Sequence, residues 1–123
     1  MKYLILIYHN PDSRQIWESF SEEQRGAGLH AYAVLNEQLA ASGELLAAEA
    51  LDEPGSAKHV ILRDGQTVAS DGPFAEAKEH LAGFYFVDVE SEQRALDIAA
   101  RIPEARFGLV ELRPVMDLSA FEP

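Results

Sequence analysis

Residues 2–8 read KYLILIY, a continuous run of apolar and β-forming side chains that ends at the polar sequence NPDS of residues 10–13. A run without polar alternation is typical of a strand buried on both faces in the middle of a sheet. Residues 83–89, GFYFVDV, have the same character. The two runs therefore predict central strands of a sheet that needs cover on both of its faces.

A long helix is predicted after the first strand. Ser21 and Gln24 have the spacing of a capping box, and Gly43 is a typical helix stop, so we expect a helix from Glu22 to Ser42. At 3.6 residues per turn one face of this helix is directed at the sheet. That face contains Gly28, Leu29, Tyr32, Leu35, Asn36 and Leu39.

The rest of the chain predicts four more strands and a second helix. We expect a strand at 44–51, a pair of strands at 58–63 and 66–70, a helix at 92–102 and a last strand at 109–115. Asp64-Gly65 is a strong signal for a two-residue hairpin turn. The implied register pairs Arg63 with Gln66, Ile61 with Val68 and His59 with Ser70.

Without the hairpin, this order is βαββαβ, the ferredoxin-like α+β arrangement. We expect an antiparallel sheet with both helices on one face and the β-hairpin as an insertion. We expect one or two helical turns in the polar segment through His80, with Pro73 at the first helical position. The length of 123 residues fits a single domain, here residues 1–118 with a loosely held tail at 119–123.

Composition excludes several classes of function. Ten Lys and Arg against 21 Asp and Glu give a net charge of −11, which disfavours nucleic-acid binding. No segment predicts a membrane span, a signal peptide or a membrane-binding basic helix. The chain has no cysteine, which excludes thiolate chemistry and fits a cytoplasmic location. Its four His lack a metal-ligand spacing, so we expect neither a metal nor a cofactor.

The sheet face without helices predicts a homodimer. An exposed apolar face of that size is unusual on a monomer, and a second copy packed face to face would cover it. Alternation directs Leu46, Ala48, Ala50, Val110 and Leu112 toward the helices. Glu49, Glu111 and Arg113 then lie on the other face, either as a structural ion-pair set or as part of a ligand cavity.

Two further groups of residues are candidate site residues. His59 and Asp71 are predicted to lie close together, where a carboxylate can orient a general base, although a solvent-facing hairpin His also fits. Gly72, Pro73 and Phe74 either shape a turn or form a pocket wall, with Lys78 as an anion ligand. The second group, Arg25, Tyr32 and Asn36 on the first helix, either lines a pocket or bonds neighbouring backbone.

The stretch SDGPFAEAKEHLAGFYFVDV at residues 70–89 resembles the DGPF region of the YCII-related family. The resemblance implies a dimeric α/β barrel and genes that often lie beside extracytoplasmic-function sigma factors. Some members of that family are thought to use a His–Asp dyad. Here the dyad positions hold Tyr32 and Ile102, so the dyad is absent, and Ala77 replaces the usual Thr.

Two functions remain open at this point. One is a cofactor-independent lyase, isomerase or hydrolase that acts on a small organic molecule bound between helix and sheet. The alternative is a non-catalytic ligand-binding or regulatory dimer linked to stress-responsive transcription. A polar cavity with a displaced His or carboxylate favours the enzyme, whereas a filled space between the sheets favours the binding module.

Overall fold

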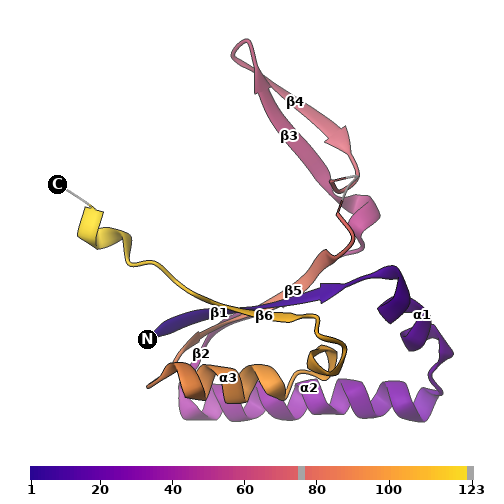
Figure 1. The fold of residues 1–123 in the computed structure, drawn as a ribbon, viewed down its shortest axis with the longest axis vertical. Helices are drawn as coiled ribbons and strands as arrows, with labels where there is room; N and C mark the ends of the chain where they lie inside the picture. The colour runs from indigo at the N-terminus through magenta and orange to yellow at the C-terminus, as the bar shows by residue number, and fades with distance from the viewer. Residues whose placement is uncertain (75–76, 122–123) are drawn as a thin grey trace.

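A computed structural model describes residues 1–74 and 77–121 and shows one open antiparallel sheet with helices on one face (Figure 1). In sheet order its strands are β2 (Leu45–Ala50), β5 (His80–Asp88), β1 (Lys2–His9) and β6 (Val110–Pro114). The covering helices are α2 (Glu22–Ser42) and α3 (Glu92–Ala100). This order confirms the predicted ferredoxin-like arrangement, and the sheet of the single chain does not close into a barrel.

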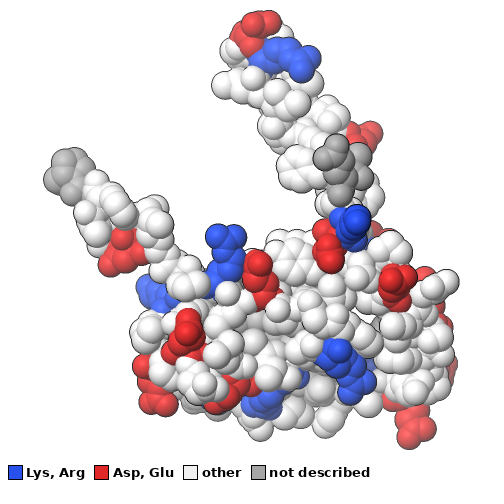
Figure 2. Space-filling model, in the orientation of Figure 1, with Lys and Arg blue, Asp and Glu red and all other residues white. Residues whose placement is uncertain are grey.

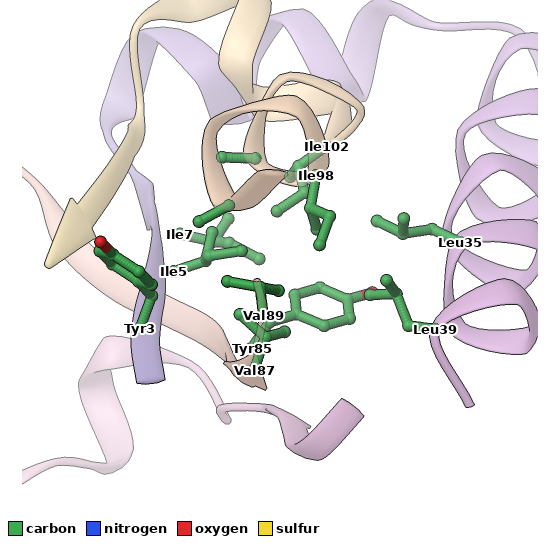
Figure 3. Close-up of a cluster of buried hydrophobic side chains, with 12 residues drawn as sticks. Tyr3, Ile5, Ile7, Leu35, Leu39, Tyr85, Val87, Val89, Ile98 and Ile102 are labelled. Atoms are coloured by element: carbon green, nitrogen blue, oxygen red, sulfur yellow. The ribbon is translucent and has the colours of Figure 1, made fainter. Parts of the chain in front are cut away.

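The hydrophobic core lies between the sheet and the two helices (Figure 3). Alternate residues of β1 and β5 point into it, because successive side chains of a strand leave opposite faces. The helices supply Leu35 and Leu39 from α2 and Ile98 from α3, all fully buried. The sheet supplies Tyr3, Ile5, Ile7, Tyr85 and Val87. None of the described helices is both long and apolar enough to cross a bilayer.

The ends of α2 follow the predicted signals, but part of its predicted inner face is wrong. Ser21 and Gln24 form the capping box, and Gly43 ends the helix at φ 80°. Leu29, however, is 62% exposed. Figure 1 shows that the first turns of α2 run beyond the sheet and lie beneath another helix. A helical wheel shows which residues share a face of a helix, but it does not show where the sheet that covers this face ends.

The helix that lies over the first turns of α2 is α1 (Pro11–Ser19), which was not predicted from the sequence. Asn10 caps it, since the Asn10 side chain accepts from Ser13 N and the Ser13 hydroxyl accepts from Asn10 N. The residues read as a strand end are therefore also a helix start, with Pro11 in the first turn. α1 places polar residues beside the end of β1.

The inserted hairpin consists of β3 (Lys58–Arg63) and β4 (Gln66–Asp71), and it has the predicted register throughout. Asp64 and Gly65 have positive φ values of 51° and 76°, as a two-residue hairpin turn requires. The hairpin forms its own two-stranded sheet and projects from the body on the side away from α2 and α3, as does the segment after β6 (Figure 1). The described residues between β4 and β5, 72–74 and 77–79, contain no helix, and the rest of the predicted turns at 75–76 lie outside the described residues.

The predicted faces of β2 are only partly right. A bulge between Leu45 and Ala47 shifts the register against β5, so Leu45 packs on the core and Leu46 is exposed. Beyond the bulge the prediction is confirmed, because Ala48 packs on the core and Glu49 lies opposite Phe84 on the open face. Val110 and Leu112 of β6 also pack on the core as expected.

Candidate functional site

Two adjoining hollows, both partly open to solvent, lie at the base of the hairpin. The larger, about 540 Å³, lies between the hairpin and the start of β5. The smaller, about 220 Å³, shares the wall formed by residues 51–54 and 80–81 and adds His9 and Arg14. Three of the four His, namely His9, His59 and His80, line this region. No group of three or more His, Asp or Glu within the described residues could hold a metal ion.

His59 lies in the wall of the larger hollow. Its ring stacks on Phe74 with 4.4 Å between ring centroids and 31° between the planes. Its Nε2 atom is buried and has no hydrogen-bond partner among the described residues. A buried polar atom without a partner is rare, because its desolvation is not offset by a hydrogen bond.

The predicted His59–Asp71 dyad is not formed. Asp71 lies opposite Lys58 and accepts a hydrogen bond from its ammonium group, whereas His59 lies opposite Ser70. Adjacent residues of a strand leave opposite faces, so the Asp71 carboxylate and the His59 ring are on different sides of the ribbon. The alternative of a solvent-facing hairpin His does not fit either, because the Nε2 atom of His59 is buried.

The turn after Asp71 closes the hairpin. Gly72 has φ 92°, a conformation that favours glycine, and its N–H donates to Ala57 O over 2.7 Å. Pro73 and Phe74 then reach the larger hollow as part of its wall. Lys78, the predicted anion ligand, is exposed and does not line it.

A second polar group lies beside the smaller hollow. The Tyr32 hydroxyl donates to the Glu104 carboxylate, 2.6 Å from Oε1 and 2.5 Å from Oε2. His9 Nε2 is 3.9 Å from Glu104 Oε2, whose side chain is only 14% exposed. Burial, together with the bond to Glu104, raises the pKa of Tyr32 well above its ordinary value of 10.0. The arrangement is a carboxylate held by a neutral tyrosine and facing an imidazole.

The other predicted residues of α2 have protein partners. Asn36 accepts a hydrogen bond from the Tyr85 hydroxyl, and burial raises the pKa of Tyr85. Arg25 donates to Trp17 O over 3.1 Å and to Glu18 O over 2.9 Å. Arg25 therefore holds the end of α1 and does not join Tyr32 and Asn36 in one pocket.

Glu49, Glu111 and Arg113 lie on the open sheet face and away from both hollows. Glu111 accepts from the Tyr8 hydroxyl over 3.4 Å. The register places these charged residues at the sheet edges, with apolar residues of β1 and β5 between them. They are therefore not one compact ion-pair set.

Sequence reasoning left open whether His9 faces a cavity or solvent and did not select it as a site residue, and it missed Glu104. The signal was present in part, because the dyad position on the first helix falls at Tyr32. The other position, Ile102, is buried in the core, and the carboxylate comes from Glu104, just after Pro103. Moving the expected carboxylate position two residues along the chain, from Ile102 to the other side of Pro103, would have identified Glu104.

The class of protein is thus a ferredoxin-like α+β domain with an inserted hairpin and a polar site at the hairpin base. The model of the YCII-related domain matches residues 1–119, and the chain belongs to this family. It is 32% identical over 117 residues to an uncharacterized protein of Rhizobium meliloti (strain 1021), covering 94% of this chain and 92% of the relative.

Proposed function

We propose that this protein is a cofactor-independent acid–base enzyme that acts on a small organic molecule bound in the hollows at the hairpin base. The observation that supports it is the line of groups His9, Glu104 and Tyr32, which ends at the smaller hollow. A carboxylate that faces an imidazole can orient the ring and stabilise the imidazolium formed when the ring takes up a proton.

Each group has a defined part in this proposal. His9 takes a proton from the substrate, or from a water that attacks it, and returns the proton to the product. Glu104 orients His9, and Tyr32 holds Glu104 in place. The stacked rings of His59 and Phe74 supply a flat wall of the larger hollow. Lyase, isomerase and hydrolase reactions all fit this equipment.

The test is a panel of small esters, lactones and β-substituted acids, assayed with wild-type protein and three variants. For any substrate turned over, His9→Asn should lower kcat about 100-fold or more, because the general base is lost. Glu104→Gln should lower it about tenfold. His30→Asn is the matched control, since His30 is exposed on α2. Full activity of His9→Asn would refute the role of His9.

We also propose a homodimer formed through the open sheet faces. Leu4, Leu6, Phe84 and Phe86 form an apolar block on this face and are only half-buried in the single chain. Leu6→Lys should therefore give a folded monomer in sedimentation experiments. Leu96→Lys, on the exposed side of α3, is the control and should leave the dimer intact.

One observation favours the non-catalytic alternative. Asp71 is paired with Lys58, and Gly72 closes the hairpin, so two residues of the DGPF sequence have structural roles. In this version the hollows hold a ligand without chemistry, and the dimer acts as a sensor connected with sigma-factor-dependent transcription in the cytoplasm. A ligand that binds wild-type and His9→Asn protein equally, and that neither protein converts, would favour it.

A further inference from the structure

The open sheet face carries its charges in an ordered pattern. Pairing across the sheet places Glu49, Phe84, Leu6 and Glu111 in one row. The next row, two residues away along each strand, contains Ala47, Phe86, Leu4 and Arg113. Each row thus has two apolar residues in its centre. The first row is acidic at both ends, and the second ends in Arg113 on β6.

This pattern distinguishes two ways to stack a second copy on the face. A two-fold axis parallel to the strands would place each row on itself, so that Glu49 of one copy faces Glu111 of the other. Two such like-charge contacts disfavour this packing. An axis perpendicular to the strands places the first row on the second. Glu111 of each copy then faces Arg113 of the other, and the phenylalanines and leucines stack.

The perpendicular axis has a consequence for the hollow at the hairpin base. The hairpin and the C-terminal segment, Val115–Phe121, project on the open side from opposite ends of the sheet (Figure 1). Figure 2 shows both as arms that stand clear of the body. The perpendicular axis exchanges the two ends of the sheet, so each hairpin and the C-terminal segment of the other copy lie at the same end, on opposite edges of the stacked sheets.

The two arms are chemically suited to each other. Charged residues of the hairpin gather at its tip and base, and its shaft is uncharged (Figure 2). Phe74, in the wall of the hollow, is 74% exposed, and Met116 and Phe121 of the C-terminal segment are 67% and 72% exposed. This segment can span roughly 15–20 Å, and the sheet edges lie about 14 Å apart. It is therefore long enough to reach the hollow of a second copy.

We infer that two copies pack open face to open face about an axis perpendicular to the strands, and that the C-terminal segment of each copy closes the hairpin-base hollow of the other. The occupant of this surface is thus a second copy of the chain. The inference rests on the homodimer proposed above. It makes the candidate site incomplete in a single chain.

Charge reversal tests the axis. Glu111→Arg and Arg113→Glu should each raise the dimer Kd roughly 10- to 100-fold in sedimentation equilibrium, because like charges then face each other. The double variant Glu111→Arg/Arg113→Glu should restore the Kd to within about threefold of wild type, since the facing pair is re-formed with its signs exchanged. Tighter association of Glu111→Arg alone would overturn the inference, because it would mean that Glu111 faces Glu49.

Cross-linking tests both parts, and the chain has no native cysteine to interfere. A mixture of E111C and R113C proteins should form an interchain disulfide, whereas a mixture of E49C and E111C should not. A mixture of I61C and L118C proteins should be joined by a short bismaleimide. A monomeric wild type would refute the homodimer itself. A dimer that joins E111C to R113C, but not I61C to L118C, would refute closure of the hollow alone.

Discussion

Arg94 of α3 donates two hydrogen bonds to Glu44, 2.9 Å from Nε to Oε2 and 2.8 Å from Nη2 to Oε1. The pair ties the start of α3 to the residue before β2, and Ser42 donates a third bond to the same carboxylate. The bonds from Arg94 lower the pKa of Glu44 from 4.5 to about 2. The ionised Glu44 carboxylate thus stabilises the fold, and this stabilisation is lost in acid.

Its contribution to stability should depend on pH. Because the pKa of Glu44 is lower in the folded state, the contribution is complete above about pH 4.5 and is lost as the pH falls toward 2. Glu44→Gln should cost about 1–2 kcal/mol at pH 7 and less at pH 3. Urea unfolding at both pH values measures this. Glu37→Gln, on the exposed side of α2, is the control, and an equal loss for both variants would contradict the role of Glu44.

The contribution of Tyr32 to stability should instead be lost at alkaline pH. Its pKa is raised on folding, so the unfolded chain loses the proton near pH 10 while the folded chain keeps it. Stability should therefore fall as the pH rises above about 10. Tyr32→Phe should cost about 1–3 kcal/mol at neutral pH, because Glu104 loses its donor, and should make the alkaline slope shallower. Unfolding curves between pH 8 and 11 provide the comparison, and an unchanged slope would be inconsistent with this account.

Gly83 is required by the close approach of β5 and β2. A Cβ atom at this position would lie 2.9 Å from the carbonyl oxygen of Glu49. Gly83→Ala should thus destabilise the protein by about 1–3 kcal/mol in thermal or urea unfolding. Gly26→Ala is the matched control, because nothing lies within 4 Å and the position is helical, so it should stabilise by up to about 1 kcal/mol.

The cap of α1 can be tested through Asn10. Asn10→Ala removes the bond that the side chain accepts from Ser13 N, 2.8 Å long, and should cost about 1 kcal/mol. Because α1 adjoins the smaller hollow through Arg14, the variant should also weaken ligand binding there. Asp12→Ala leaves the cap intact and serves as the control. Equal ligand affinity for Asn10→Ala and wild type would separate α1 from the site.

The sequence predicted best what local signals specify. Asp64-Gly65 set the hairpin and its register, and Ser21 and Gly43 set the ends of α2. The predicted face of Leu46 was wrong, because the bulge between Leu45 and Ala47 arises from packing against β5 and has no local signature in the sequence.

The candidate site was less accessible from the sequence for a related reason. Tyr32 and Glu104 are 72 positions apart, and their contact exists only because α2 packs beside the turn after α3. His59 lies in the wall of the larger hollow, but the side chain of its expected partner Asp71 leaves the other side of the ribbon. Both outcomes depend on the tertiary placement of side chains that the period of a strand or helix cannot supply.

The hairpin is a separate two-stranded sheet. Its two sides are joined at the base by hydrogen bonds from Gly72 N–H to Ala57 O and from Lys58 to Asp71. Its length is consequently uncoupled from the register of the main sheet. Residues can be added or removed in pairs at its tip without changing the faces of β2 or β5. Such a module can change in length during divergence, so the depth of the hollow at its base can change while the core stays the same.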